Sequence, residues 1–382
     1  MNISEFCKIY TGNGFPMEFQ GKKDGKYPFY KVSDISASNA QQKIFLGSAN
    51  NYIDEFDVSM LKGNIIPAGT IVFAKIGEAL KLNKRAITSC ECLIDNNVIG
   101  IKPDDNIINL LYFYYYLLKI DMIHYSESTT LPSVRKSTIE KIEVKIPPID
   151  VQNKRVSILN LCHETIKYKV ELLYNLELLV KSRFVELISK NKLIYQKVRL
   201  KDCCLISSGA TPSRKNSDYW DENGINWFKT TELKNNFLID SEEKISELGY
   251  EKTSVKLLPK HTVLIAMYGQ GKTRGMTGYL LNNATTNQAC AALISLDIIN
   301  PKYLWYTIIN SYDRLRNMAK GGTQPNLSVS SIKDFEIILP PIDIQNKFTN
   351  YIEQINKLKS DVQKSIDETQ LLMDSLMQEY FG

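Results

Sequence analysis

The sequence predicts an α+β protein in which two similar mixed α/β globular domains are separated by a pair of long antiparallel helices. Three observations predict this fold. Residues 146–154 read IPPIDVQNK, and residues 339–347 repeat this segment as LPPIDIQNK. The stretches before the two copies share several shorter motifs. The stretches after them lack Gly and Pro and have helical periodicity. Together these features indicate one plan used twice, with a pseudo-twofold internal repeat.

The repeated segment has the chemistry of a domain boundary. Its paired prolines cannot continue a strand ladder or lie inside a helix, so they end the element before them. Asp150 and Asp343 follow the prolines and are favourable N-cap residues, because a carboxylate accepts hydrogen bonds from a first helical turn. The chain is therefore interpreted as a first domain at 1–148, a central helix at 149–191, a second domain at 192–341 and a C-terminal helix at 342–382.

Four further pairs of motifs extend the repeat through both domains. In the first pair, YPFYKVSDI and INWFKTTEL share an aromatic residue, a lysine, a hydroxyl, an acid and an aliphatic residue in the same order. The pairs occupy residues 27–35 and 225–233, 67–77 and 259–269, 130–134 and 323–327, and 137–144 and 330–337. Pro340 follows Pro147 by 193 residues (340 − 147), a period too long for a solenoid, so the sequence predicts a duplicated domain.

Within each domain the pattern is mixed. Short apolar runs predict strands at 71–74, 263–266, 143–146 and 336–339. Longer apolar segments predict buried helices at 109–119 and 303–310. The tyrosine run at 112–116 is accordingly interpreted as core rather than as a surface for stacking on bases.

The two segments after the repeated prolines predict long helices with a narrow apolar stripe. The first stripe contains Ile166, Val170, Leu173, Leu176, Val180, Phe184 and Leu187. The second contains Phe348, Ile352, Ile355, Leu358, Val362, Ile366, Met373 and Leu376. Such stripes are typical of a coiled-coil seam, so each helix needs the other to bury it. Antiparallel pairing returns the chain to the first domain, which predicts two heads held apart by a helical spacer.

The bulk composition sets limits on the environment. No apolar run reaches the roughly 18–20 residues of a membrane span, and the first residues do not resemble a signal peptide. The seven cysteines have no framework spacing, which favours reduced thiols and a cytoplasmic protein. A net charge of +5 permits an acidic partner such as nucleic acid without requiring one.

One motif resembles a phosphate-binding loop. Residues 266–273 read AMYGQGKT and follow an apolar strand, but a true phosphate loop needs a helix that starts at the Lys-Thr pair. The next residues, RGMTG, contain two glycines and oppose a helix, so nucleotide binding is disfavoured. The sequence shows no catalytic constellation and no metal-ligand spacing, which predicts a protein without catalytic or metal-binding residues of its own.

A duplicated globular unit that ends in a Pro-Pro-acidic-x-Gln junction and a long helix resembles the specificity (S) subunit of type I restriction–modification systems. The second copy carries the pattern in Asn287-Gln288, in the GGTQPNL of residues 321–327 and in residues 339–345. The first copy departs from it, with STTLP at 128–132 and with Asn96-Asn97 aligned to Asn287-Gln288.

The resemblance implies that each globular domain is a target recognition domain that reads one half of a bipartite double-stranded DNA target. It implies that the spacer helices set the unread gap and dock two methyltransferase subunits. Those subunits would bind S-adenosylmethionine and methylate adenine, while this chain would hold no cofactor. A restriction subunit would join the complex for cleavage. The alternative, from a different class, is a bivalent protein-binding scaffold with a coiled-coil strut.

For DNA contacts the useful side chains are Arg and Lys at guanine, Asn and Gln at adenine, and hydroxyls at phosphates. In the first domain the candidates are Lys31, Ser33, Lys75, Lys81, Lys84 and Arg85. In the second domain they are Lys229, Thr231, Tyr268, Gln270, Lys272, Arg274, Asn287 and Gln288. Lys31 and Lys229 occupy equivalent positions in the two copies, which also suits a scaffold role or a phosphate contact.

Overall fold

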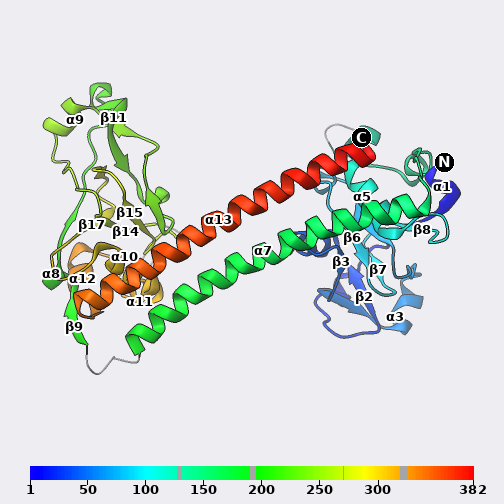
Figure 1. The fold of residues 1–382 in the computed structure, drawn as a ribbon, viewed down its shortest axis with the longest axis horizontal. Coiled ribbons are helices and arrows are strands. Elements are labelled where there is room, and N and C mark those ends of the chain that lie inside the picture. Colours follow the sequence, from blue (N-terminus) through cyan, green and yellow to red (C-terminus); the bar gives the residue numbers. More distant parts are fainter. Residues whose placement is uncertain (127–130, 190–194, 270, 319–325) are drawn as a thin grey trace. The chain divides into compact units, whose positions relative to one another are not determined.

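The chain forms two compact units. The computed structural model describes residues 1–126, 131–189, 195–269, 271–318 and 326–382. Unit 1 contains Met1–Leu172 and Val362–Gly382, and unit 2 contains Leu173–Asp361. The two long helices are α7 (Ile149–Ser189) and α13 (Ile342–Phe381). Each of them has one part in unit 1 and the other part in unit 2 (Figure 1).

The described residues of unit 1 form two sheets. The larger has the order β1-β8-β5-β6-β3, with β1 (Cys7–Thr11), β8 (Val98–Pro103), β5 (Ile71–Ala74), β6 (Arg85–Thr88) and β3 (Phe45–Leu46). The smaller has the order β4-β2-β7, with β4 (Asn51–Ile53), β2 (Tyr27–Tyr30) and β7 (Leu93–Ile94). Two pairs are parallel, β3 with β6 and β2 with β7, and the others are antiparallel.

Unit 2 repeats both sheets in the same order. The larger runs β10-β17-β14-β15-β12, with β10 (Cys204–Ser208), β17 (Cys290–Ser295), β14 (Val263–Ala266), β15 (Thr277–Leu280) and β12 (Asn236–Leu238). The smaller runs β13-β11-β16, with β13 (Lys244–Ile245), β11 (Trp220–Phe228) and β16 (Thr285–Thr286). The parallel pairs, β12 with β15 and β11 with β16, also match, which confirms the predicted internal repeat.

Helices surround these sheets in both units. In unit 1 they are α1 (Ile3–Phe6), η1 (Met17–Phe19), α2 (Val32–Ala40), α3 (Glu55–Met60), α4 (Glu78–Lys81), α5 (Leu110–Lys119), η2 (Met122–Tyr125) and α6 (Lys136–Ile139). In unit 2 they are α8 (Leu200–Cys203), η3 (Ser217–Tyr219), η4 (Thr230–Glu232), α9 (Glu247–Glu251), α10 (Pro301–Asn310), α11 (Tyr312–Asn317) and α12 (Val329–Lys333). Among the described residues, none of the helices combines the length and the apolar character needed to cross a membrane.

Three of the four predicted strands are present, and one is absent. Residues 71–74, 263–266 and 336–339 form β5, β14 and β18 (Glu336–Leu339), and β18 pairs with β9 (Gln196–Arg199). Residues 143–146 form only an isolated bridge between Glu143 and Asn2. The prediction of a strand at 143–146 is therefore wrong. The backbone bonds here join Val144 N–H to the carbonyl of Met1 (2.8 Å) and Ile3 N–H, in helix α1, to the carbonyl of Ile142 (3.0 Å), and they do not form a regular ladder.

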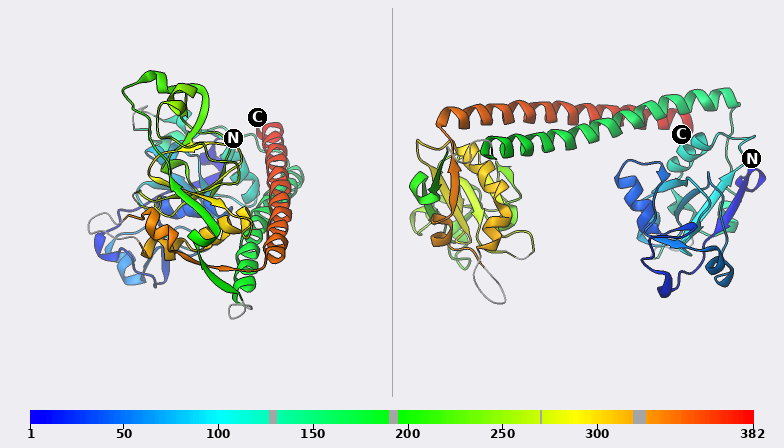
Figure 2. Two further views of the ribbon diagram at one scale, coloured as in Figure 1. Left: turned by 90° about the vertical axis from the view of Figure 1, so that its left-hand side faces the viewer. Right: turned by 90° about the horizontal axis from the view of Figure 1, so that it is seen from below.

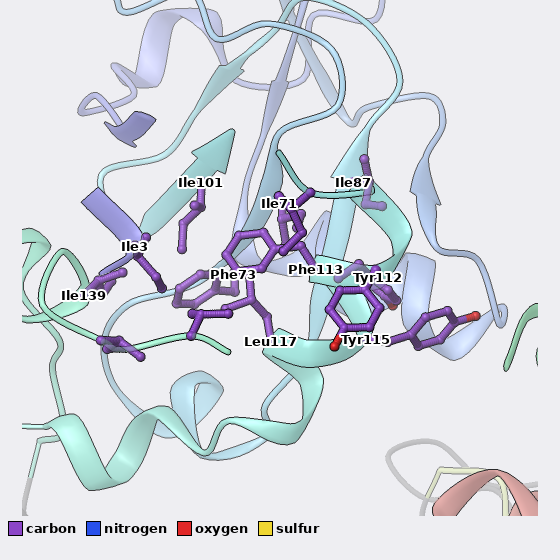
Figure 3. Packing of buried hydrophobic residues seen from close by; sticks show 14 of the residues in the cluster. Ile3, Ile71, Phe73, Ile87, Ile101, Tyr112, Phe113, Tyr115, Leu117 and Ile139 are labelled. Atoms are coloured by element: carbon purple, nitrogen blue, oxygen red, sulfur yellow. The ribbon is translucent and has the colours of Figure 1, made fainter. Parts of the chain in front are cut away.

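The core of unit 1 packs helix α5 against the larger sheet. Ile71 and Phe73 from β5 meet Phe113 and Leu117 from α5, and all four side chains are at most 1% exposed (Figure 3). Tyr112 and Tyr115 are equally buried, so the interpretation of the tyrosine run as core is confirmed.

The repeated junction is held by a buried glutamine in both units. Gln345 accepts a hydrogen bond from the backbone N–H of Asn300 (2.8 Å) and donates to the carbonyls of Pro340 (2.8 Å) and Ile298 (3.1 Å). Gln152 makes the same three contacts, with Asn109 N–H (2.8 Å) and the carbonyls of Pro147 and Ile107. The glutamine therefore joins the start of each long helix to the loop before α5 or α10.

The N-cap prediction at this junction is wrong. Helices α7 and α13 begin at Ile149 and Ile342, so Asp150 and Asp343 occupy the second helical position. The N–H of Gln152 bonds to the carbonyl of Pro148 (3.1 Å), because proline already has the φ that a helix start needs. The aspartates still lie in the first turn, where a negative charge is favourable beside the positive end of the helix dipole.

Within each unit, α7 and α13 lie side by side and antiparallel (Figure 2). In unit 1, Lys169 donates to Ser365 Oγ (2.7 Å) and to Thr369 Oγ1 (3.1 Å). In unit 2, the rings of Phe184 and Phe348 are 5.5 Å apart. Two predicted seam residues do not belong to the seam, since Val170 and Leu358 are 42% and 50% exposed.

Two glycines mark a close approach between segments that are far apart in the sequence. A Cβ atom on Gly12 would lie 2.0 Å from the carbonyl oxygen of Asp95, and one on Gly209 would lie 1.9 Å from that of Thr286. In unit 1 the N–H of the next residue, Asn13, bonds to the carbonyl of Ile94 (2.9 Å). In unit 2 the N–H of Ala210 bonds to the carbonyl of Thr286 (3.0 Å). The end of β1 therefore lies directly against β7 in unit 1, and the end of β10 lies directly against β16 in unit 2.

Candidate nucleic-acid interface

The first candidate surface is the loop between β14 and β15 in unit 2. Tyr268 is 41% exposed, Lys272 is exposed and Arg274 is half-buried. Gln270 lies outside the described residues. Residues 271–272 and 274–275 form turns, and β15 begins at Thr277. The helix that a phosphate loop requires after Lys272 is therefore absent from this described segment.

Helix α11 holds this loop by its backbone. The Tyr312 hydroxyl donates to the carbonyl of Lys272 (2.7 Å). Arg316 Nη1 donates to the carbonyl of Arg274 (2.9 Å) and to the Tyr312 hydroxyl (3.1 Å). Sequence analysis did not identify Tyr312 or Arg316, since each lies about 40 residues from its partner and belongs to no motif.

Asn287 and Gln288 lie in the turn between β16 and β17. Gln288 is exposed, and its side-chain oxygen accepts a hydrogen bond from Thr211. The Asn287 side chain accepts from the N–H of Ala289 (3.1 Å), as that of Asp95 does from the N–H of Asn97 (2.9 Å). Asp95 is thus the structural counterpart of Asn287, and the sequence alignment of Asn96-Asn97 with Asn287-Gln288 is one residue out of register.

The positive charge of Lys229 is balanced by two neighbouring glutamates. Its amine pairs with Glu243 (2.7 Å) and Glu242 (3.0 Å). Glu243 also accepts from Arg214, and these two cations lower the pKa of the Glu243 carboxyl to about 2. The Arg214 guanidinium lies 3.9 Å from the Trp220 ring centroid. Lys229 therefore belongs to a charge cluster within unit 2, whereas Thr231 on η4 is exposed.

The equivalent lysine in unit 1 also has a local partner. The Lys31 amine lies 4.4 Å from the centroid of Phe15. The backbone N–H of Lys31 donates to Asp34 (2.8 Å), as that of Lys229 does to Glu232 (2.8 Å). The Lys-x-x-acid pattern that the copies share is thus a helix start in both units, while Ser33 on α2 is exposed.

The loop between β5 and β6 differs from its counterpart in unit 2. It contains the short helix α4, on which Lys81 pairs with Glu78 (2.6 Å). The backbone of Lys75 bonds to Asn97 and Val134 (2.9 Å each), and its side chain is half-buried, as is that of Lys84. This loop therefore pairs one of its cations with its own Glu78, whereas residues 267–276 contain no acidic residue.

Arg85 is a core residue, so its prediction as a DNA contact is wrong. The residue is 1% exposed, and its guanidinium donates to the carbonyls of Ile120 (2.9 Å) and Asn83 (3.3 Å). Its guanidinium also lies 4.8 Å from the centroid of Phe73. Burial lowers the pKa of Arg85 to about 10. A side chain committed to these internal contacts cannot reach a DNA duplex.

The described residues contain no group of three or more His, Cys, Asp or Glu side chains that could hold a metal ion. The two units share one scaffold. The loop between β5 and β6 in unit 1 and the loop between β14 and β15 in unit 2 occupy the same place in the larger sheet but are built differently. Side chains suited to nucleic acid, namely lysines, an arginine and a tyrosine, lie on or beside these loops.

Comparison with known proteins supplies the family. The specificity subunit of the type I restriction enzyme MjaIX from Methanocaldococcus jannaschii is 26% identical over 191 residues, which are 48% of this chain. That match spans 43% of the relative, less than half of its length.

Two solved structures share the fold over the whole chain. The type I restriction–modification S subunit from M. genitalium has a TM-score of 0.56 at 14% identity, covering 100% of this chain and 95% of that one. A chain from a study of complex assembly and conformational transition in the type I R-M system has a TM-score of 0.64 at 16% identity, covering 100% and 96%.

A family model of the type I restriction modification DNA specificity domain matches residues 1–177 and 194–369. The two matches cover most of the sequence and confirm the resemblance seen in the repeated junction. The chain therefore belongs to the type I restriction modification DNA specificity family and carries the family's domain twice.

Proposed function

We propose that this chain is the non-catalytic specificity subunit of a type I restriction–modification complex and that each unit reads one half of a bipartite double-stranded DNA target. The observation that carries the proposal is the pairing of a repeated scaffold with loops that differ. The sheets have the same strand order, but α4 with its Glu78–Lys81 pair occupies one loop and a basic turn occupies the other. A shared scaffold suits a shared task, and different loops suit different base sequences.

The candidate contacts divide by exposure and charge. Tyr268, Lys272 and Arg274 offer stacking and cationic groups on one loop, and Gln288 offers an amide nearby. We propose phosphate or base contacts also for Ser33, Lys75, Lys81, Lys84, Thr231, Asn287 and Gln270. Lys31 and Lys229 serve first as scaffold residues because local partners already hold their amines.

The host genome provides the test of this function. Removal of the gene for this chain is expected to abolish adenine methylation at one split motif, because the methyltransferase partners would lose their target. Methylated adenines are mapped by single-molecule sequencing in the parent, in the deletion strain and in a complemented strain. An unchanged methylation map would contradict the proposal and favour a bivalent protein-binding scaffold.

Docking of two methyltransferase subunits forms the second part of the proposal. Leu178 and Leu179 on α7 belong to unit 2, and Leu371 and Leu372 on α13 belong to unit 1. The two pairs are 193 residues apart (371 − 178), which is the repeat period, and all four residues are 41–72% exposed. Two copies of one partner need the same surface twice, and these leucine pairs supply it.

We propose that each leucine pair contacts one methyltransferase subunit, which brings S-adenosylmethionine and the adenine-methylating activity to the complex. A restriction subunit would join the same assembly for cleavage. The leucine pairs support this proposal because exposed adjacent leucines that recur in both repeats have no role in the seam between α7 and α13.

Replacing both Leu371 and Leu372 by lysine is expected to change the complex from two methyltransferase subunits to one. The charges would oppose burial at one docking surface and leave the other intact. Native mass spectrometry of the co-expressed proteins measures the stoichiometry. The matched control is Leu161→Lys, since Leu161 is 70% exposed but has Gln354 at its counterpart position. Two bound subunits in the double variant would exclude this docking surface.

A further inference from the structure

We propose that Tyr312 and Arg316 are positioning residues that set the base preference of unit 2 by holding the backbone of residues 271–276. This inference rests on the proposed function, since it concerns how the loop between β14 and β15 reads DNA. Neither residue needs to touch DNA. Both act through the two carbonyl groups that they bind, those of Lys272 and Arg274.

Helix α11, which carries both donors, is itself held in place by contacts with the rest of unit 2. Leu315, between the two positioning residues, is fully buried in the core of unit 2. On the same helix, Arg314 donates to the carbonyl of Glu336 on β18 (2.9 Å) and lies 4.7 Å from the centroid of Phe335. The helix is thus fixed by residues that do not touch the loop, and Tyr312 and Arg316 extend this support to the loop backbone.

The loop backbone lies close to both side chains. Gly275 has a φ of +88°, and a Cβ at this position would lie 3.3 Å from Tyr312 Cδ2 and 3.4 Å from Arg316 Cγ. A left-handed glycine and the two fixed carbonyls that precede it restrict the backbone from Lys272 to Gly275. Lys272 remains exposed, so its side chain is presented from a backbone that cannot shift freely.

Unit 1 ties the equivalent loop with the opposite hydrogen-bond polarity. There the donors lie at the end of the segment between β5 and β6 and on the first residue of β6. Asn83 donates to the carbonyl of Leu118 (2.7 Å), and Arg85 donates to that of Ile120 (2.9 Å). The acceptors follow in or just after α5, whereas in unit 2 the donors lie on α11 after α10. Both units thus tie this loop to the same region of the fold by unrelated residues.

This recurrence indicates that a fixed loop is a requirement of the unit and not an accident of one sequence. A side chain that distinguishes one base pair from another must be held to within about half an ångström of its contact geometry. Loss of the tie would leave the basic charge in place but let the loop adopt several conformations. Base preference would then fall much more than overall affinity, because affinity depends mainly on phosphate charge.

The experiment selects bound duplexes from a randomised double-stranded DNA library with the full chain and sequences them. The variants are Tyr312→Phe, which removes the hydroxyl, and Arg316→Lys, which keeps the charge and loses the guanidinium fork. The matched control is Asn317→Gln, since Asn317 is an exposed residue at the end of the same helix. Asn83→Asp is the reciprocal variant in unit 1, because it removes the donor and keeps a residue type that tolerates the φ of +50° at this position.

For the wild-type chain we expect a split motif with a preference of about 5–150-fold for the cognate base pair at each position. In Tyr312→Phe and Arg316→Lys this preference is expected to fall about tenfold in one half of the motif only, with Asn317→Gln unchanged. Asn83→Asp should weaken the other half. Tryptophan fluorescence checks that unit 2 is folded in each of its variants, since Trp220, Trp227 and Trp305 all lie there.

Each outcome separates the inference from the function on which it rests. A wild-type chain that enriches no motif would overturn the proposed function and the positioning role with it. A clear split motif that both unit 2 variants leave unchanged would overturn the positioning role alone. Equal loss in both halves would also overturn it, because a general change in stability or charge would then be the cause.

Discussion

Gln345→Ala is expected to lower the free energy of unfolding of unit 2 by about 3–5 kcal/mol, because it leaves several buried backbone groups without partners. Gln345 is fully buried and satisfies the N–H of Asn300 and the carbonyls of Ile298 and Pro340. Alanine can replace none of these bonds.

Urea unfolding of the full chain followed by tryptophan fluorescence measures this change, since the three tryptophans lie in unit 2. The control is Asn346→Ala in the next position, which loses only an exposed bond to the Asn300 side chain (2.8 Å). Its expected cost is about 1 kcal/mol or less. Equal effects of the two substitutions would show that the buried glutamine does not hold the junction.

Gly12→Ala is expected to lower the stability of unit 1 by about 3 kcal/mol, at the upper end of what overpacking costs. The new methyl group would lie 2.0 Å from the carbonyl oxygen of Asp95, so one of two backbone segments must move. Either movement weakens the bond between Asn13 N–H and the Ile94 carbonyl and disturbs the junction of the two sheets.

Urea unfolding followed by circular dichroism checks this prediction, with Gly14→Ala as the matched control. A Cβ on Gly14 meets no atom within 4 Å, so the control should keep the wild-type midpoint. If Gly12→Ala also keeps that midpoint, the close approach at the end of β1 is not a constraint on the fold. The equivalent change at Gly209 should act in the same way on unit 2, where the contact is 1.9 Å.

The sequence predicts the repeated scaffold well because its strongest signals are local. Paired prolines end a segment wherever they occur, and a long stretch without Gly or Pro forms a helix under its own periodicity. The N-cap was misplaced because the carbonyl of Pro148 accepts the bond at the helix start and Ile149 is the first helical residue, so Asp150 falls inside the first turn. Strand 143–146 was predicted from its apolar pattern, but that pattern does not show whether a neighbouring segment forms a ladder with it.

The side-chain roles at the candidate interface were harder to predict because they depend on contacts between distant segments. Nothing near Arg85 in the sequence indicates that the carbonyl of Ile120 will accept from it. Lys229 looks like a free cation until the fold brings Glu243 to 2.7 Å from it. The sequence shows that the two copies share an acid, Asp34 or Glu232, but not what this acid does. In the structure its carboxylate accepts a hydrogen bond from the backbone N–H of Lys31 or Lys229 at the start of a helix.

The division of α13 between the units has a consequence for synthesis on the ribosome. Residues 373, 376, 377, 380 and 381 pack against the core of unit 1, and the Phe381 ring lies 5.1 Å from that of Tyr112. At roughly 5–20 residues per second, translation takes on the order of 10–40 s to proceed from the end of the first segment of unit 1 to these residues. Nascent unit 1 therefore exposes apolar surface while unit 2 is being made, and a chaperone that covers this surface would protect the growing chain from aggregation.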